Sequence, residues 1–250
     1  MFLLYVVYAL TCKVAIFELC HDDASCNASK LNVSISCVVQ HRIPTDKQSV
    51  YAENYFYYDF YEQNYKQFAT YDYVGLLTYK AKQKVVLPAN VCEQCCTLNA
   101  TAYDFRMAGR FFHLTMPVLH LALREHGNMF MTCWRLLFSQ NTDIHQTIYT
   151  SDRIPRLYFN YWITRPAVMK EYADWITGLR NAIEHSENME LQKCLYADPK
   201  YASKSSKFFM TRFGRYTMHP FVFERLLPVY LMSRNIKLVQ LNEKQPVRRL

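Results

Sequence analysis

Residues 71–80 read Tyr71-Asp-Tyr-Val-Gly-Leu-Leu-Thr-Tyr-Lys80, and this stretch decides the fold. Its middle is apolar and its ends are polar, a pattern typical of a strand that enters a protein core. The preceding residues 50–68 predict a long aromatic helix, because tyrosines recur there at three- or four-residue intervals. A helix that leads into a buried strand indicates an α/β protein.

The same alternation of strand and helix runs through the first ninety residues. Residues 11–25 fit either a helix or a strand over 14–19, and the local pattern does not decide between them. Further strands are predicted over residues 4–9, 31–39 and 85–87. These elements predict a mostly parallel central sheet with helices on both faces. Because such sheets bind ligands at the carboxyl ends of their strands, chemistry is expected from residue 79 onward.

The rest of the chain is more helical. Helices are predicted over residues 117–126, 128–139, 166–185 and 220–233, with extended segments at 155–163 and 236–241 and a loop at 92–110. The proline at position 166 suits the first turn of its helix. The expected fold class is therefore one α/β domain with a helical decoration toward the C-terminus.

The composition favours one domain and an anionic ligand. With 250 residues, 51% of them hydrophobic, the chain can bury a core. Lysine and arginine exceed aspartate and glutamate by 29 − 21 = 8. The densest basic cluster is Lys200, Lys204, Lys207, Arg212 and Arg215, which matches no recognised nucleic-acid-binding module. Nucleic acid is not expected as a partner, and binding through residues 200–215 is the alternative.

The nine cysteines are odd in number and irregular in spacing. Cys92, Cys95 and Cys96 resemble half of a zinc site, but no matching pair follows at the required spacing. Reduced thiols in a cytoplasmic protein are therefore expected. Three triplets, Asn27-Ala-Ser29, Asn32-Val-Ser34 and Asn99-Ala-Thr101, fit the glycosylation pattern, although such triplets often arise by chance.

The first twelve residues are apolar but lack the basic start and the small-residue cleavage site of a signal peptide. Lys13 ends the apolar run well short of the ~20 residues that span a bilayer. A buried strand is favoured and no transmembrane segment is expected; a cleaved or anchoring segment is the alternative.

Three separated segments resemble one family. The first holds Tyr51-Ala-Glu-Asn54 and the strand quoted above, the second runs from Phe159 to Trp175, and the third from Phe221 to Leu231. In order and spacing they are similar to the Asp-Tyr-Val-Gly-Leu, Phe-Asn-x-x-Ile and Glu-Arg-Leu blocks of glycosyltransferase-like domains from capsular and cell-surface polysaccharide biosynthesis. Similar transferases occur in large viruses that build their own glycans.

The resemblance implies a nucleotide-sugar transferase (GT-A-like) fold. It implies transfer of a hexose or pentose from a nucleotide-diphosphate donor to a glycan acceptor, with residues 1–90 as the nucleotide-binding half and 91–250 as the helical acceptor-side half of one domain. The expected location is the cytoplasm, or the host cytoplasm for a viral protein. A degenerate domain that binds glycan or nucleotide without catalysis is the alternative.

Two departures from the family bear on activity. The family's His-Tyr-Arg-Arg becomes Thr78-Tyr-Lys-Ala81, so Lys80 and Lys82 are left to hold phosphate as point charges rather than as bidentate forks. The metal-binding Asp-x-Asp of nucleotide-sugar transferases is missing, and Asp22-Asp23 is the nearest substitute. No metal site is identified, and manganese or magnesium is the ion that the family implies.

The quoted strand and the helix before it supply five candidate site residues. Tyr79, Lys80 and Lys82 are expected to bind donor phosphates, with a solvated strand end as the alternative for Lys82. Two roles are equally expected for Asp72. It either binds the donor or a metal as a catalytic group, or it caps the strand. Glu53 is expected to contact sugar or ribose, or to form a salt bridge.

The later blocks supply the other candidates. Asn160 can bond sugar hydroxyls through both sides of its amide, and Trp162 either stacks on a sugar ring or lies in the core. Glu224 is the predicted general base, because a helix start favours a carboxylate; an ion pair with Arg225 is the alternative. Arg225 is counted with the substrate-binding residues, and His219 either touches phosphate or caps the helix.

These predictions share one spatial requirement. Tyr79 and Lys80 have to meet Asn160 and Glu224 around one cleft at the edge of the sheet.

Overall fold

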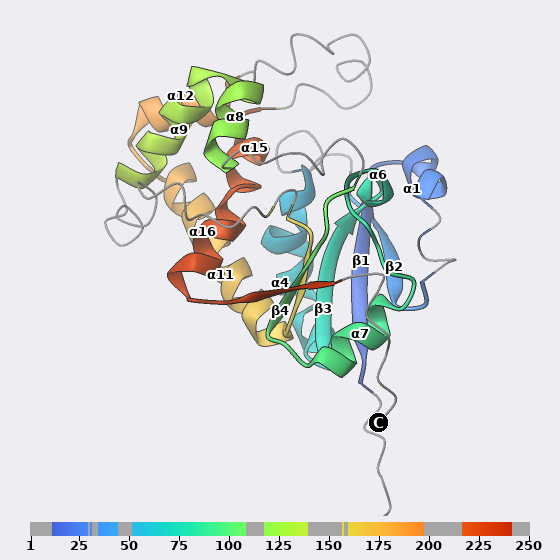
Figure 1. Ribbon diagram of the computed structural model, residues 1–250. Coiled ribbons are helices and arrows are strands. Elements are labelled where there is room, and N and C mark those ends of the chain that lie inside the picture. The colour runs from blue at the N-terminus through green and yellow to red at the C-terminus, as the bar shows by residue number, and fades with distance from the viewer. Residues whose placement is uncertain are drawn as a thin grey trace, which may run out of the picture.

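A mixed sheet forms the centre of the protein (Figure 1). The computed structural model describes residues 12–29, 31, 35–44, 52–108, 118–139, 157, 160–197 and 217–241. Within them the strands are β1 (Val14–Cys20), β2 (Val38–Arg42), β3 (Tyr73–Thr78), β4 (Ala102–Phe105), β5 (Trp162–Thr164) and β6 (Leu238–Leu241). Their order across the sheet is β2-β1-β3-β5-β4-β6.

The sheet is mostly parallel, as the sequence predicts. β1 pairs in parallel with β2 and β3, and β4 pairs in parallel with β6. β5 is antiparallel to both of its neighbours. The residues that enter β5 therefore lie at the same edge of the sheet as the residues that leave β3.

Gly75 lets β5 approach β3 closely. A β-carbon at this position would lie 2.7 Å from Cγ1 of Ile163 and 3.1 Å from the carbonyl oxygen of Trp162. The first distance is too short for a β-carbon and the second is tight, so packing against β5 rather than an unusual backbone angle favours glycine here.

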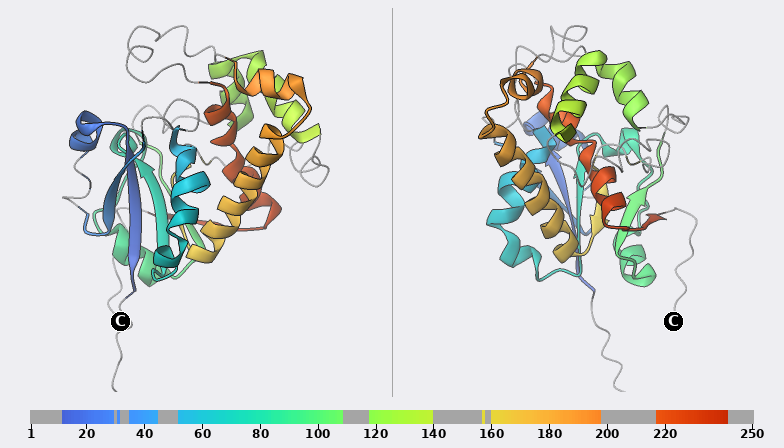
Figure 2. Two further views of the ribbon diagram at one scale, coloured as in Figure 1. Left: turned by 180° about the vertical axis from the view of Figure 1, so that it is seen from behind. Right: turned by 90° about the vertical axis from the view of Figure 1, so that its left-hand side faces the viewer.

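Helices cover both faces of the sheet (Figure 2). One face of the sheet packs against aromatic residues of α11 and of the segment before β3, and it carries Phe17, Leu76 and Trp162. The other face packs against α7 and carries Ile16, Leu77 and Ile163. The helices are α1 (Asp23–Ser29), α4 (Tyr61–Gln63), α5 (Tyr65–Phe68), α6 (Ala81–Lys84), α7 (Val91–Leu98), α8 (Val118–His126), α9 (Asn128–Ser139), α11 (Pro166–Glu184), α12 (Met189–Leu195), α15 (His219–Phe223) and α16 (Leu226–Ser233).

Several predicted elements are confirmed. The strand at 71–79 and the helices at 128–139 and 166–185 are present with nearly the predicted bounds. Of the two alternatives left open for residues 11–25, the strand is the one present, as β1. The aromatic helix is present but irregular: it begins as a 3-10 helix, η1 (Ala52–Asn54), continues as a π-helix, η2 (Phe56–Phe60), and ends as α4 and α5.

Other predicted elements are wrong. The strand expected over 31–39 begins only at Val38, and 85–87 forms an isolated bridge between Val85 and Met107 rather than a strand. The loop expected over 92–110 contains α7 and β4. The helix expected over 220–233 is broken between α15 and α16. The expected strand at 4–9 and the basic cluster at 200–215 lie outside the described residues.

Eight of the nine cysteines form disulfides, so the prediction of reduced thiols is wrong. The bridges are Cys12–Cys96, Cys20–Cys26, Cys37–Cys92 and Cys133–Cys194. Cys95 is buried and unpaired, and burial raises its thiol pKa to about 12. With these cysteines paired, the expectation of a cytoplasmic location loses the observation on which it rested.

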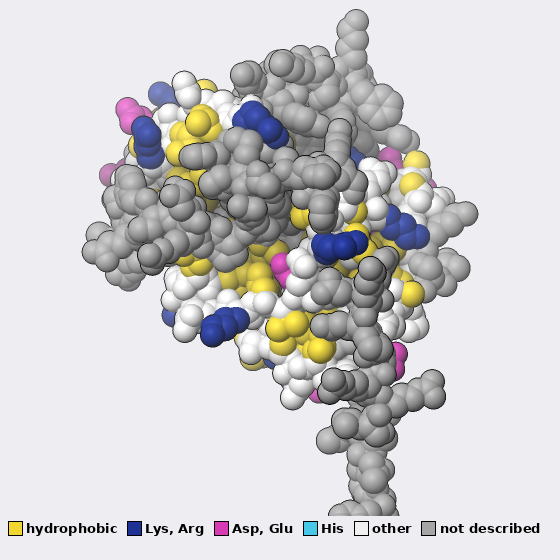
Figure 3. Space-filling view, in the orientation of Figure 1, with side chains coloured by type: hydrophobic (Ala, Val, Ile, Leu, Met, Phe, Trp, Pro, Cys, Tyr) yellow, Lys and Arg dark blue, Asp and Glu magenta, His cyan; other side chains and the backbone are white. Residues whose placement is uncertain are grey.

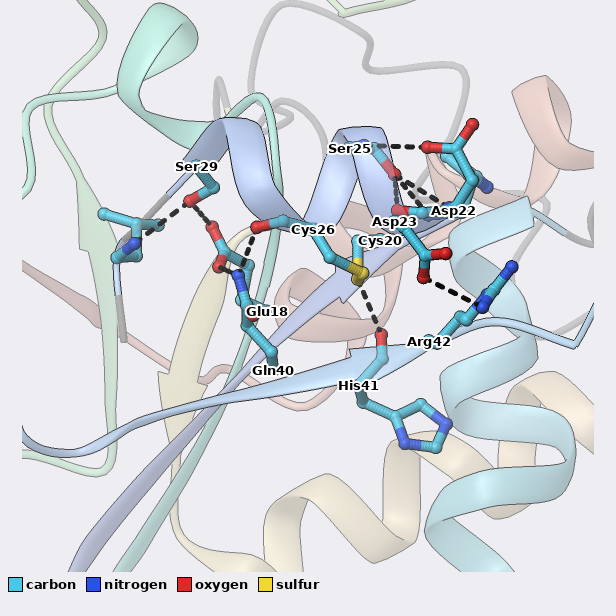
Figure 4. Close-up of a disulfide and its surroundings, with 12 residues drawn as sticks. Glu18, Cys20, Asp22, Asp23, Ser25, Cys26, Ser29, Gln40, His41 and Arg42 are labelled. Atoms are coloured by element: carbon cyan, nitrogen blue, oxygen red, sulfur yellow. Dashed lines mark hydrogen bonds and ion pairs between the residues drawn. A yellow bond between two sulfur atoms is a disulfide. The ribbon is translucent and has the colours of Figure 1, made fainter. Parts of the chain in front are cut away.

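Two of the bridges fasten α7 to the amino ends of β1 and β2, because Cys12 and Cys37 directly precede those strands. A third bridge, Cys20–Cys26, fastens α1 to the carboxyl end of β1 (Figure 4). There the Ser29 hydroxyl donates to the buried Glu18, whose pKa is raised by burial.

No helix among the described residues is long and apolar enough to cross a membrane. On the face shown in Figure 3, lysine and arginine side chains of the described residues lie at separate points rather than in one basic patch.

Candidate functional site

The carboxyl edge of the sheet brings together segments that are far apart in the sequence. His21 follows β1, Tyr79 and Lys80 follow β3, and Asn160 and Tyr161 lead into β5. β3 and β5 are paired as far as Leu76 and Trp162, and just beyond this pair the hydroxyls of Thr78 and Tyr161 share a hydrogen bond. This is the edge where ligands bind in open α/β sheets.

His21, Tyr79 and Lys80 form one contacting group. The rings of His21 and Tyr79 meet edge to face at 5.6 Å, and Nζ of Lys80 lies 5.2 Å from the centre of the Tyr79 ring. Burial lowers the pKa of His21, and the charge of Lys80 lowers it further, whereas Glu53 acts in the opposite direction.

Four other charged groups act on Lys84 at this edge. Its Nζ is 5.4 Å from the centre of the Tyr161 ring. Burial lowers its pKa, Lys80 and Arg225 lower it further, and the carboxylates of Glu224 and Glu53 oppose the shift. Because these four groups all act on one ammonium, we treat Glu53, Lys80, Lys84, Glu224 and Arg225 as one charged cluster.

The two carboxylates of the charged cluster also act on Tyr161. Burial raises the pKa of Tyr161, and the charges of Glu53 and Glu224 raise it further. Two carboxylates and two lysines, from segments 171 residues apart between Glu53 and Glu224, thus converge on the same edge of the sheet.

Lys84 is not among the predicted site residues. Residues 81–84 form α6, in which positions four apart share a face. That spacing places Lys84 with Lys80 and turns Lys82 away. The prediction chose Lys82 because it follows Thr78-Tyr-Lys-Ala81, the stretch that replaces the family's His-Tyr-Arg-Arg.

Glu224 lies in the turn between α15 and α16. Its Oε2 accepts a hydrogen bond from Nη1 of Arg225 at 3.2 Å, and the same nitrogen donates to the carbonyl oxygen of Phe221 at 2.7 Å. The ion pair given as the alternative is therefore present. About a quarter of the Glu224 side chain stays exposed (25%, against 9% for Arg225), so its carboxylate is still accessible to a ligand.

Asn160 is held in an uncommon conformation beside the charged cluster. Its backbone φ is 54°, in the left-handed region, and its side chain is buried. Its Nδ2 donates to Oδ1 of Asn54 at 3.2 Å, whereas its own Oδ1 accepts no hydrogen bond from the described residues. A buried acceptor without a donor costs about 1–3 kcal/mol.

Asp72 lies at the wrong end of β3 for the predicted catalytic role. The strand separates it from Lys80 by roughly 20 Å, at ~3.3 Å per residue. Its Oδ2 accepts a hydrogen bond from the backbone N–H of Lys13 at 2.8 Å. The strand-capping alternative is the one that the structure shows.

Trp162 and His219 belong to the core. Nε1 of Trp162 donates to the Tyr57 hydroxyl at 3.1 Å, and the indole is fully buried, so it offers no face to a sugar ring. The His219 ring stacks on Phe223 at 4.0 Å. Burial, with a further contribution from Arg180, lowers the His219 pKa to about 3, so this neutral ring is not placed to bind phosphate.

Lys82 points to a different part of the protein. It is exposed on α6, and its charge acts on Glu18 rather than on the charged cluster. The solvated alternative therefore describes it better than phosphate binding.

The described residues contain no group of three or more histidine, cysteine, aspartate or glutamate side chains that could hold a metal ion. Asp22 and Asp23, the nearest substitute for the missing motif, have structural roles. Oδ1 of Asp22 accepts from the Ser25 N–H at 2.7 Å, and Asp23 pairs with Arg42 at 3.1 Å (Figure 4).

Two hollows lie elsewhere on the described surface. One of about 340 Å³ is lined by Leu31, Lys82 and Val85 among others, and one of about 560 Å³ lies beside Cys12, Lys13 and Tyr71. Neither is lined by a member of the charged cluster. We place the candidate site at the cluster, because both hollows lack its opposed lysines and carboxylates.

No protein-family model matches this sequence, and no curated protein matches it. Among solved structures, the chain is similar to the apo structure of WbbM, a bifunctional glycosyltransferase, with a TM-score of 0.52 and 12% sequence identity. The match covers 91% of this chain and 44% of that chain, so this chain spans less than half the length of WbbM. The likeness shows a shared fold, and the chain has a glycosyltransferase-like α/β architecture.

Proposed function

We propose that this protein is a glycosyltransferase that moves a hexose or pentose from a nucleotide-diphosphate donor to a glycan acceptor. One observation carries the proposal. In a fold shared with a glycosyltransferase, the charges of Glu53, Lys80 and Glu224 act on Lys84, whose ammonium lies against the Tyr161 ring at the carboxyl edge of the sheet. Polysaccharide synthesis or the building of a protein-linked glycan is the process that this reaction would serve.

The lysines suit the leaving group. When the acceptor oxygen attacks C1 of the donor sugar, the bond from C1 to the diphosphate oxygen breaks and negative charge develops on the diphosphate. Fixed positive groups lower the energy of that charge in a site that excludes water. Lys80 and Lys84 lie near each other and half-buried at this edge, so we assign them to the diphosphate.

The carboxylates suit the acceptor and the sugar. Glu224, accessible and oriented by Arg225, is assigned to accept the proton of the attacking hydroxyl. Glu53 is assigned to hydroxyls of the ribose or the donor sugar, and Oδ1 of Asn160 to one further hydroxyl. Residues 1–90 then hold the nucleotide and residues 91–250 the acceptor, with the two halves sharing one sheet.

Manganese or magnesium is not given a role. The described residues include no group of side chains that could hold either ion. The reaction is therefore assigned to side chains alone, and the binding test below includes both ions.

Donor binding is the decisive test. The melting temperature of the full chain would be measured with UDP, GDP and CDP, each with and without manganese or magnesium. We expect one nucleotide to raise it, and Lys80→Ala and Lys84→Ala each to weaken binding by about tenfold, the loss of one charge-assisted contact. Lys82→Ala is the matched control and should bind as the wild type does. Absence of any shift with every nucleotide would refute the proposal.

A degenerate binding domain is the second candidate, and one observation favours it. Thr78, where the resembling family has histidine, is buried and bonded to Tyr161, so it does not reach a ligand. Donor binding without turnover across a panel of nucleotide sugars and glycan acceptors would support this reading over catalysis.

A further inference from the structure

We propose that Asn27 and Asn99 carry N-linked glycans, attached in the oxidising secretory compartment in which the four disulfides form. Each asparagine opens an Asn-x-Ser/Thr triplet whose middle residue is alanine, and both side chains are exposed. The buried Asn54 and Asn160, by contrast, lie outside such triplets. This inference does not depend on the proposed function.

The disulfides identify the compartment. Bridges persist in secreted and lumenal proteins and are rare in the cytosol, where thiols are kept reduced. Here they join cysteines 84, 6, 55 and 61 residues apart, in both parts of the chain. Secretory compartments also attach N-linked glycans. The cysteine pairing and the exposed triplets involve different residues, so they point independently to the same environment.

The surroundings of Asn99 leave the correct atom available. The residue ends α7 in the left-handed conformation, with φ of 49°. Its Oδ1 accepts from the guanidinium of Arg165 and from the Tyr73 hydroxyl, the latter at 3.4 Å. No described residue accepts a hydrogen bond from its Nδ2, the nitrogen that bears a glycan. The side chain is thus anchored through its oxygen and available through its nitrogen.

The position of Asn99 is also compatible with the candidate site. Arg165, its partner, also donates to the carbonyl oxygen of Asp72 at 3.4 Å, which places Asn99 at the amino edge of the sheet. A glycan here lies at the opposite end of β3 from the charged cluster and does not obstruct it.

Asn27 has to be modified before α1 packs. The hydroxyl of Ser29, which completes its triplet, is buried in the folded chain and donates to Glu18 (Figure 4). Cys26, the residue before Asn27, is bridged to Cys20. Attachment at Asn27 therefore precedes closure of this bridge, whereas Thr101 of the Asn99 triplet is still exposed in the folded chain.

The attachment needs one co-reactant, an oligosaccharide carried on a lipid through a diphosphate. The asparagine Nδ2 attacks C1 of the first sugar and a nitrogen–carbon bond forms. The bond between C1 and the diphosphate oxygen breaks, the amide nitrogen loses one proton, and the lipid diphosphate leaves.

The test uses the full chain expressed in mammalian cells and treated with peptide N-glycosidase. We expect an increase in gel mobility on treatment, and conversion of Asn27 and Asn99 to aspartate, located by peptide mass spectrometry. Asn27→Gln should remove the first glycan. Thr101→Ala should remove the second while keeping the contacts of Asn99, and Thr101→Ser, which preserves the triplet, should retain it.

Thiol labelling under denaturing conditions without reductant tests the compartment. One reactive thiol, Cys95, is expected. Recovered protein whose mobility does not respond to the glycosidase overturns the proposal, as does modification at Asn32 alone. Labelling of all nine cysteines overturns it as well.

Discussion

Asn160 donates its side-chain amide to Oδ1 of Asn54, which lies 3.2 Å away and 106 residues earlier in the chain. Asn54 donates in turn to the carbonyl oxygen of Pro220 at 3.4 Å. This buried chain of hydrogen bonds joins the segment before β5, the 3-10 helix that carries Glu53, and the helix that precedes Glu224. It fixes the spacing of the two carboxylates that the proposed reaction uses.

Replacing Asn160 by glycine should lower transfer more than stability. Glycine tolerates the positive φ but has no amide oxygen for the substrate. Loss of one hydrogen bond to substrate is expected to lower kcat/KM about tenfold. Asn235→Gly is the control, because Asn235 is also at a positive φ (52°) but is exposed in the turn after α16. Equal kcat/KM values for the two variants would exclude Asn160 from substrate binding.

Glu224→Gln should abolish turnover while leaving donor binding unchanged. A positioned general base contributes about 10²- to 10⁴-fold to the rate, and the amide cannot accept the proton. The measurement is kcat beside the Kd for the nucleotide. Glu171→Gln, at an exposed glutamate paired with Arg234 on α11 and α16, should retain full activity. Wild-type turnover in Glu224→Gln would remove Glu224 from catalysis.

Gly75→Ala should destabilise the fold, whereas Gly178→Ala should not. The new methyl group at position 75 meets Ile163 at 2.7 Å, and overpacking of this kind costs about 1–3 kcal/mol. At position 178, in α11, nothing lies within 4 Å of the added carbon, and alanine favours a helix over glycine by about 1 kcal/mol. Urea denaturation of both variants checks the prediction, which fails if the two midpoints move in the same direction.

The protein should lose stability as the pH falls below 6.5. Burial lowers the pKa of His126 and of His219 to about 3 in the folded state, against an ordinary value of 6.5. Between these values the unfolded chain binds more protons, so stability is complete above pH 6.5 and declines on acidification by about 1.4 kcal/mol per pH unit for each histidine. Melting curves at about pH 7, 6 and 5, the range in which histidine changes its charge, test this prediction. The melting temperature of a double variant, His126→Gln and His219→Phe, should depend less steeply on pH.

The Cys133–Cys194 bridge should contribute more stability than Cys20–Cys26. It closes a separation of 61 residues rather than 6, and the loop entropy removed from the unfolded chain grows with loop length. On that account, replacing both members by serine is expected to cost about 4 kcal/mol for the long loop and about 2 kcal/mol for the short one. Chemical denaturation of the two double variants gives the comparison, and a larger loss for the short loop would contradict it.

The parts of the fold that follow local patterns are readable from the sequence. β3 is a run of six buried residues between polar ends, and α9 and α11 have clear helical periodicity, so each appears near its predicted bounds. The mostly parallel sheet follows from the alternation of these elements. The short α6 and the strand at 102–105 have too few residues to show a period, and both were missed.

The candidate site is less predictable, because it depends on contacts distant in sequence. Lys80, Glu53 and Glu224 all act on Lys84, and Asn160 contacts Asn54, but neither of the two hollows on the described surface is lined by them. Their meeting around one cleft and their chemical roles stay predictions. Asp72 precedes β3, so the rule that ligands bind at the carboxyl ends of parallel strands already argued against a catalytic role for it. The cysteine pairs could not be read at all, since nine cysteines at irregular spacing allow many connectivities.

The two bridges that fasten α7 to the amino ends of β1 and β2 have a mechanical consequence. They cross-link that edge of the sheet and make it stiff. Among the described bridges, only the short Cys20–Cys26 bridge lies at the carboxyl edge. The carboxyl edge is therefore the less cross-linked of the two, and it is the edge that carries the charged cluster.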